Sequence, residues 1–307
     1  MAGVAGAIAL VLFISFAAIA VSSRSGPDEA AADTALSRRG PYDGLGSWVD
    51  MFSWSASFTP GGNPHFGLAD IDAMAANGVQ NLYIQGASQT GPATVLEADR
   101  LLALIARAHH DRIAVVVWYL PSLVNPADDL ARLLAISRLP AEGVAVDIES
   151  IDVANVAARN AALVGLSRKL RQALPGRPLG AIVMPATQLE VVNPYYWPSF
   201  PYLDLAPFYD AWLPMTYWTG RLPESGFRDG YRYTADSIHR LRLDLGALLG
   251  PKAKVNPIGG VSVDGIAPGD MDAFVHAVKE TGSTGGSIYE WPGTDPGAWT
   301  VLRALRA

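Results

Sequence analysis

Residues 143–150 read GVAVDIES, a short apolar run that ends in two carboxylates separated by one isoleucine. Small and β-branched residues in such a run favour a buried strand. Side chains alternate between the two faces of a strand, so Asp147 and Glu149 point the same way. Two adjacent carboxylates repel each other when both are ionised, which raises the pKa of at least one of them. The stretch therefore predicts a buried strand with a functional site at its end.

Seven more stretches of similar character recur along the chain, about 30–40 residues apart. They cover residues 46–54, 79–86, 113–120, 179–186, 211–218, 254–261 and 285–292. Helical patterns lie between several of them, at residues 98–110, 126–137, 153–174 and 270–280. Eight such units predict an α/β fold, a single (β/α)8 TIM barrel over residues 45–307. An open doubly wound sheet is the alternative, but it usually carries a glycine-rich turn after its first strand, where this chain has DMFSW.

Composition excludes several classes of function. The 307 residues carry 29 acidic and 23 basic side chains, so no basic field is present to hold nucleic acid. The chain has no cysteine, which excludes disulfides, thiolate catalysis and cysteine-ligated zinc. Four of the five histidines fall in predicted helices and only His65 does not, so they form no ligand cluster. We expect neither a metal nor another cofactor.

The N-terminus carries an apolar segment. Residues 2–21 run for about 20 positions without a charge, which is long enough to cross a bilayer. Residues 1–22 are therefore predicted to be a signal peptide or a transmembrane anchor, and the polar residues 23–44 a disordered tether. Arginines follow the apolar run and none precedes it, which does not favour export by the positive-inside rule. We nevertheless expect a domain outside the cytoplasm, secreted or anchored, that meets the membrane only through this segment.

The last residues of the predicted strands form the expected site, because the active sites of TIM barrels lie at the carboxyl ends of the strands. These residues are Asp50, Trp54, Gln85, Trp118, Tyr119, Asp147, Glu149, Met184, Tyr217, Trp218, Asn256, Tyr289, Glu290 and Trp291. Carboxylates among aromatic rings are typical of a sugar-binding site. Arg221 follows the sixth strand, and two roles remain open for it: binding an acidic sugar, or pairing with Glu149 or Asp147. Such a pair would lower the pKa of the carboxyl group and weaken it as a proton donor.

Three short motifs resemble those of the chitinase-type family 18 glycoside hydrolases. EGVAVDIE (142–149) resembles the family's strand-four signature, PMTYW (214–218) its strand-six motif, and GGSIYEW (285–291) its strand-eight segment. The chain as a whole is also similar to a group of bacterial glycosyl-hydrolase-like TIM barrels. The resemblance implies that Glu149 is the proton donor, that Asp147 is its neighbouring carboxylate and that Tyr217 steadies an acetamido group of the substrate.

The chain departs from the family pattern at four positions. Glu142 and Ala145 stand where the family has its first two aspartates, Trp218 replaces the aspartate after the tyrosine, and Trp291 arrives one residue late. These departures concern the specificity for N-acetyl sugars more than the acid on strand four.

Three functions follow as hypotheses. The first is a glycoside hydrolase that acts on an extracellular or envelope polysaccharide, with Glu149 as general acid and Asp147 assisting. In this hypothesis a second group stabilises the oxocarbenium-like state. It is the substrate's own N-acetyl carbonyl, or else Asp50 or Glu290. The second is a non-catalytic carbohydrate-binding barrel anchored at the cell envelope. The third, a phosphate-handling metabolic barrel, rests only on the glycine pair within residues 256–265.

Overall fold

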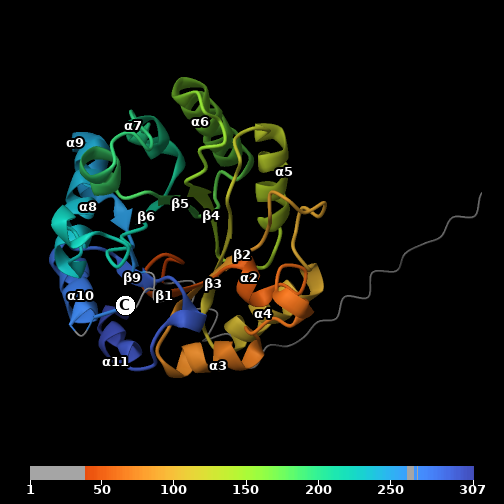
Figure 1. The fold of residues 1–307 in the computed structure, drawn as a ribbon. Coiled ribbons are helices and arrows are strands. Elements are labelled where there is room, and N and C mark those ends of the chain that lie inside the picture. The colour runs from red at the N-terminus through yellow and green to blue at the C-terminus, as the bar shows by residue number, and fades with distance from the viewer. Residues whose placement is uncertain (1–38, 261–265, 268) are drawn as a thin grey trace, which may run out of the picture.

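The computed structural model describes residues 39–260, 266–267 and 269–307. The predicted signal or anchor (1–22), most of the tether and part of the glycine-rich stretch 256–265 lie outside these residues. Within them, nine parallel strands form one sheet in the order β7-β6-β5-β4-β3-β2-β1-β9-β8 (Figure 1). The strands are β1 (Gly44–Val49), β2 (Asn81–Gln85), β3 (Ala114–Tyr119), β4 (Gly143–Ile148), β5 (Leu179–Val183), β6 (Ala211–Pro214), β7 (Lys254–Val255), β8 (Ile258–Gly259) and β9 (Gly285–Ile288).

The sheet closes through its seventh strand, which is divided into β7 and β8. β7 pairs with β6, β8 pairs with β9, and a parallel bridge joins Met215 to Ile258. Between the two pieces stands Pro257, which has no N–H to donate to a neighbouring strand. Its carbonyl still accepts from the Ser287 N–H at 3.0 Å. The eight predicted strand positions are therefore present, and the predicted TIM barrel is confirmed.

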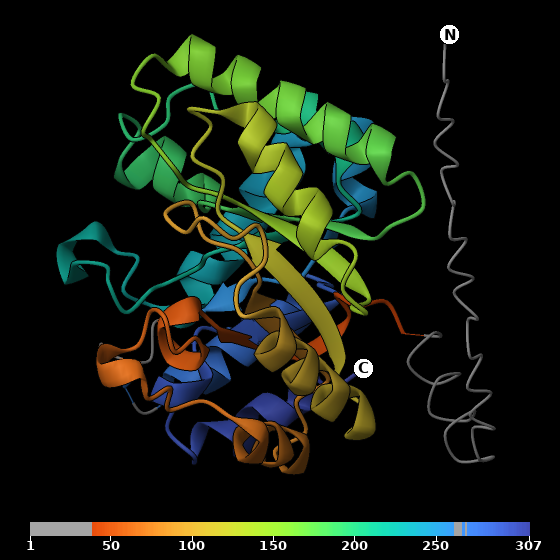
Figure 2. The same ribbon diagram turned by 90° about the vertical axis from the view of Figure 1, so that its right-hand side faces the viewer.

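Helices surround the sheet on its outer side (Figures 1 and 2). They are α2 (Met51–Trp54), α3 (Leu68–Ala76), α4 (Ala98–His110), α5 (Pro126–Ile136), α6 (Val156–Ala173), α7 (Tyr202–Leu205), α8 (Gly230–Asp244), α9 (Gly246–Leu249), α10 (Asp270–Glu280) and α11 (Ala298–Leu302). Side-chain caps start several of them: Asn125, Asn155 and Asp229 accept from backbone N–H groups in the first turns of α5, α6 and α8. None of the helices in the described part of the chain has the length and apolarity that crossing a membrane requires.

The core has two layers, one between sheet and helices and one inside the barrel. Tyr42 belongs to the inner layer and fills the end of the barrel where the strands begin. It is 3% exposed, and its hydroxyl donates to the Val144 carbonyl at 2.8 Å. Gly180 and Gly143 make room for it, since a Cβ on Gly180 would lie 2.7 Å from the Tyr42 ring and one on Gly143 2.9 Å from its hydroxyl. Residues 39–44, which the sequence pattern placed in the disordered tether, are thus packed against or inside the barrel.

The two ends of the barrel carry different parts of the chain. Figure 2 shows the loops after β1 and β6 projecting on one side, while the start of the described chain and the C-terminus lie on the other. Gln80 joins these two segments, because it contacts Ala307 through its side chain and accepts from Arg39 through its carbonyl. The carboxyl ends of the strands are therefore free to form a site.

Candidate active site

Asp147 and Glu149 lie at the carboxyl end of β4 and line the same cavity. Asp147 is only 7% exposed, and its Oδ1 has no hydrogen-bond partner among the described residues. Burial raises the pKa of Asp147 well above its usual value, and the nearby charge of Glu149 adds to the shift. Burial also raises the pKa of Glu149. A pair with both pKa values raised retains a proton at higher pH than isolated carboxyls do, which is what a general acid needs.

The cavity has a volume of about 310 Å³ and opens at the carboxyl ends of the strands. Its walls come from six strands or their following loops: Asp50, Met51, Phe52, Gln85, Trp118, Leu120, Asp147, Glu149, Met215, Tyr217 and Tyr289. Seven of the fourteen strand-end residues expected at the site are thus brought together here.

Trp118 provides an aromatic wall of this cavity beside the carboxylate pair. Its ring meets Trp48 of the inner core edge-on, with 6.0 Å between ring centroids. The Trp118 Nε1 is buried and has no partner among the described residues. Both residues line the cavity, so a polar ligand or solvent there can complete the hydrogen bonding of this N–H and of Asp147 Oδ1.

Tyr217 and the loop after β5 hold the pair from the other side. Burial raises the pKa of the Tyr217 phenol, and the charges of Asp147 and Glu149 raise it further, which shows how close the three groups lie. Tyr196 donates its hydroxyl to the Glu149 carbonyl oxygen at 2.9 Å and so fixes the backbone that carries this acid.

A second polar group joins the ends of β1 and β9. Tyr289 donates its hydroxyl to Asp50 Oδ2 at 2.8 Å, and Asp50 Oδ1 caps α2 by accepting from the Ser53 N–H at 3.1 Å. Ser53 also donates to Glu290 Oε2 at 3.2 Å. Burial and the charge of Asp50 raise the pKa of Glu290 to about 7. The peptide bond between Tyr289 and Glu290 is cis.

Three predicted aromatic residues point away from the cavity. Tyr119 and Trp218 each follow an inward-facing residue, so the alternation of side chains turns them toward the helices. Tyr119 donates to Asp129 at 2.8 Å, and Trp218 donates to Asp270 at 3.0 Å. Trp54 is fully buried because β1 ends at Val49 and the residues after Asp50 form the helical turn α2 instead of continuing the strand. These three predicted positions do not belong to the cavity.

Asn256 was placed at the wrong end of the barrel. Its side-chain N–H groups donate to the carbonyls of Tyr42 and Gly44, at 3.0 and 3.1 Å, where the strands begin. The reason is that the seventh strand starts at Lys254, so that Asn256 stands near its beginning.

The remaining predicted residues do not line the cavity. Arg221 donates to the Gln188 side chain and lies over the Tyr233 ring, so it pairs with neither carboxylate of β4. Trp291 packs on Trp299, with ring centroids 4.9 Å apart. Met184 packs against the core, and Glu290 makes the contacts given above.

Sequence reasoning missed four lining residues, all apolar: Met51, Phe52, Leu120 and Met215. Their signal was weak, because an apolar residue after a strand is equally typical of core. Phe52 is the informative case, since its side chain is 55% exposed on α2 at the rim of the cavity. A single exposed aromatic residue is common on a protein surface, so its place in the cavity wall is what assigns Phe52 to the site.

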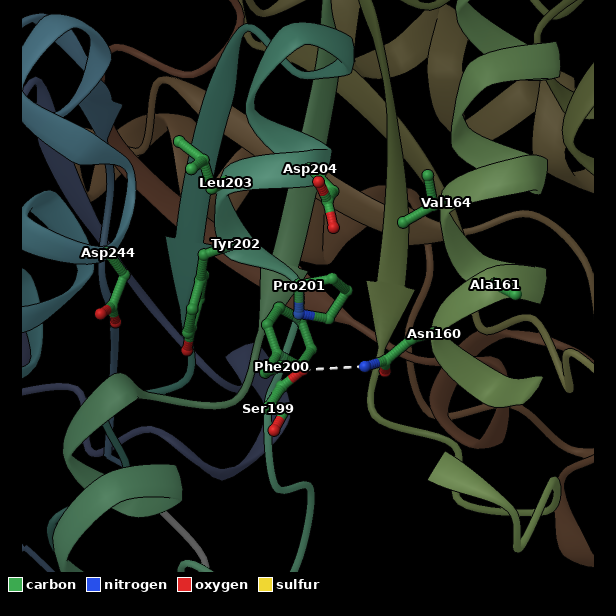
Figure 3. A pocket seen from close by; sticks show the side chains of 10 residues that line it. All are labelled: Asn160, Ala161, Val164, Ser199, Phe200, Pro201, Tyr202, Leu203, Asp204 and Asp244. Atoms are coloured by element: carbon green, nitrogen blue, oxygen red, sulfur yellow. Dashed lines mark hydrogen bonds between the residues drawn. The ribbon is translucent and has the colours of Figure 1, made fainter. Parts of the chain in front are cut away.

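A larger cavity, of about 550 Å³, lies outside the barrel among α6, the loop 199–201, α7 and α8. Figure 3 shows its walls, with Asn160 donating to the Ser199 carbonyl at 2.8 Å. Asp244 lies at its edge, with a pKa raised to about 7 by burial and by Glu190. No residue from the β4 site reaches this cavity, and it brings together no acid pair with an aromatic wall.

Comparison with known proteins supports the fold. No protein-family model and no curated protein matches the sequence. Solved structures do match: the C-terminal domain of a protein described as a chitinase, from Desulfitobacterium hafniense DCB-2, is 13% identical with a TM-score of 0.63, covering 86% of this chain and 100% of that domain. A class V chitinase from Pseudomonas fluorescens Pf-5 is 12% identical with a TM-score of 0.59, over 85% and 99% of the two chains.

The spore cortex-lytic enzyme SleL of Bacillus megaterium QM B1551 is 12% identical with a TM-score of 0.57, over 88% of this chain and 75% of that one. Identities this low establish a shared fold. The predicted resemblance to chitinase-type barrels is therefore confirmed at the level of architecture.

Proposed function

We propose that this chain is a glycoside hydrolase that acts on an extracellular or cell-envelope polysaccharide, with Glu149 as the general acid and Asp147 as the assisting carboxylate. The observation that carries the proposal is the buried carboxylate pair in a cavity with an aromatic wall. Asp147 is buried beside Glu149 with an unpartnered oxygen. The barrels of similar architecture include a class V chitinase and a spore cortex-lytic enzyme.

The first step of the reaction is protonation of the glycosidic oxygen. Burial raises the pKa of Glu149 and so favours its protonated form, while the charge of Glu149 adds to the shift at Asp147. The leaving oxygen takes this proton and Glu149 becomes ionised, while Asp147 accepts a hydrogen bond from the substrate. Trp118 presents its ring face and its Nε1–H to the sugar.

The group that stabilises the oxocarbenium-like transition state has two candidates. A substrate with an N-acetyl group supplies its own carbonyl, oriented by Asp147 and held by Tyr217. For a substrate without that group, Asp50 is the better candidate, because it lines the cavity whereas Glu290 does not. Tyr289 holds Asp50 Oδ2 in place at 2.8 Å. Whether the bond is cleaved with retention or inversion depends on the carboxyl separation in the substrate complex.

The test is hydrolysis of a panel of aryl glycosides, chitin-like oligosaccharides and envelope glycans by residues 39–307. Glu149→Gln is compared with Glu224→Gln, a matched change at an exposed rim position on the loop after β6. We expect kcat to fall by about 10²–10⁴-fold in Glu149→Gln and to stay unchanged in Glu224→Gln. Absence of turnover on every substrate, with one glycan bound equally well by wild type and Glu149→Gln, would leave the alternative of a non-catalytic carbohydrate-binding barrel.

A further inference from the structure

Charge is divided unequally between the two ends of the barrel. We call the end where the strands begin the basal face and define it by residues 39–43, the loops that precede β2 to β9, Lys254 and the C-terminal residues 303–307. It carries eight basic side chains, Arg39, Arg112, Arg138, Arg177, Lys252, Lys254, Arg303 and Arg306, and four acidic ones, Asp43, Asp111, Glu142 and Asp210. The described loops at the opposite end carry two basic and nine acidic side chains. A chain of net charge −6 thus has one positive face.

Three arginines of the basal face line one cavity of about 270 Å³: Arg39, Arg112 and Arg306. In the described part of the chain none of the three forms a salt bridge, although Asp111 also lines the cavity. Asp111 is instead occupied by Arg107 and His110, at 3.2 and 2.8 Å. The cavity therefore gathers three guanidinium groups that form no salt bridge among the described residues.

Arg39 is the most deeply placed of the three. Its Nη2 donates to the Gln80 carbonyl at 2.8 Å, whereas its buried Nε has no partner among the described residues. Burial lowers the pKa of this guanidinium, Asp43 opposes that shift, and the charge of Arg306 adds to it. An anion held between Arg39 and Arg306 would relieve both the missing hydrogen bond and the repulsion.

A left-handed backbone conformation positions Arg112, and a glycine makes room for Arg306. Gly78 and Gly282 follow the ends of α3 and α10 with φ of 84° and 62°, in the left-handed region that favours glycine. The equivalent position after α4 is Arg112, also with φ 62°, so the turn holds an arginine where glycine is the less strained choice. Gly78 in turn makes room for the Arg306 stem, since a Cβ there would lie 3.0 Å from Arg306 Cδ.

The chain that precedes the barrel leaves from this same face. Sixteen residues, 23–38, separate the predicted apolar segment from Arg39, and a chain of that length spans at most about 55 Å. A barrel anchored by residues 1–22 would therefore stay close to the bilayer and have its basal face joined to the anchor. Anionic headgroups attract basic residues near such a surface, within a Debye length of about 8–10 Å.

We propose that the basal face docks on an anionic bilayer surface, with Arg39, Arg112 and Arg306 binding the phosphodiester of a lipid headgroup. Docking orients the barrel so that the β4 cavity faces away from the membrane, toward the polymers outside it. The inference is independent of the proposed hydrolase activity, because it uses the opposite end of the barrel.

The test places one fluorophore on each face of the full chain, which is simple because the chain has no cysteine. Ala304→Cys labels the basal face and Ala93→Cys an exposed position in the loop after β2. Each labelled chain is reconstituted in phosphatidylcholine vesicles with and without phosphatidylglycerol, and quenching by a headgroup-attached quencher is measured. We expect strong quenching at position 304 only with phosphatidylglycerol, and weak quenching at position 93 in both.

The deciding variant is Arg39→Gln/Arg112→Gln/Arg306→Gln, with Arg100→Gln/Arg228→Gln/Arg232→Gln as a control that removes the same charge near the opposite end of the barrel, in the first turns of α4 and α8 and the loop after β6. Each lost basal arginine should lower the ratio of docked to undocked barrel about fivefold, while the control keeps the wild-type signal. Quenching that is equal in both lipid compositions, or unchanged in the arginine variant, would overturn the proposal.

Discussion

Replacing Asp147 by asparagine is predicted to stabilise the barrel at neutral pH although it removes a group of the candidate active site. The Asp147 carboxyl is 7% exposed and its Oδ1 is unpartnered among the described residues. Burial and the charge of Glu149 raise its pKa well above the value of a free aspartate. The folded protein therefore opposes ionisation of this group, whereas the unfolded chain does not.

The sign of the effect follows from proton linkage. Above the unfolded pKa of about 3.9, the folded state binds more protons at this site than the unfolded state does. The contribution of the Asp147 carboxyl to the unfolding free energy is fully present below that pH. As pH rises toward the pKa of the folded state, this contribution is lost at about 1.4 kcal/mol per pH unit. Asparagine has no proton to lose. The difference in unfolding free energy between variant and wild type should thus be small near pH 4 and should grow toward neutral pH.

Urea unfolding of residues 39–307 from about pH 4 to about pH 8 measures this difference. Asp152→Asn is the matched control, because Asp152 is exposed on the loop that follows the same strand. A gain in Asp147→Asn that grows with pH, absent from Asp152→Asn, is the expected result. If Asp147→Asn were less stable than wild type at all pH values, the carboxylate would be stabilising in the folded state and the reasoning from its burial would be wrong.

Two further predictions concern the base of the barrel and the rim. Tyr42→Ala should lower the unfolding free energy by about 3–5 kcal/mol, because it empties the end of the barrel. The control is Tyr195→Ala, at a side chain that is 91% exposed, which should change the unfolding free energy by less than about 0.5 kcal/mol in the same urea titration. Arg221→Gln should leave the pH profile of hydrolysis unchanged, because Arg221 is bonded to Gln188 and not to the acid; a shift of the alkaline limb to higher pH would instead show that Arg221 lowers the pKa of Glu149.

Local sequence patterns were sufficient to predict the barrel. Helices α4 and α10 begin and end where the apolar periodicity predicts, at 98–110 and 270–280, because each has a buried stripe with charged residues on its outer face. The bounds of helix α8 were not predicted, although it buries Tyr233, Ile238 and Leu241. Its mean hydropathy is low because arginines and aspartates lie between those residues, which masks the stripe.

The candidate site was predicted less completely, because a site depends on which way each side chain points. The two-residue period correctly placed Asp147 and Glu149 on one face. The same period separates Trp118 from Tyr119 and Tyr217 from Trp218, so that only the first residue of each pair faces the cavity. The residue at which a strand ends is harder still to predict. Trp54 lies outside the site because Asp50, the residue after β1, caps a helical turn.

The burial of Asp147 is also the feature that best separates a catalyst from a sugar-binding barrel. Sugar binding alone is favoured by carboxylates that are already ionised and hydrated. Such carboxylates accept hydrogen bonds from the hydroxyl groups of the sugar, and they are not destabilised when the sugar is released. A site that places one carboxyl beside another, in a wall where neither has a cationic partner among the described residues, loses stability in the absence of ligand. This loss of stability serves a function only if the site has to hold a proton at neutral pH. Protonation of a glycosidic oxygen requires such a proton. The cost at Asp147 therefore favours the hydrolase over the binding barrel.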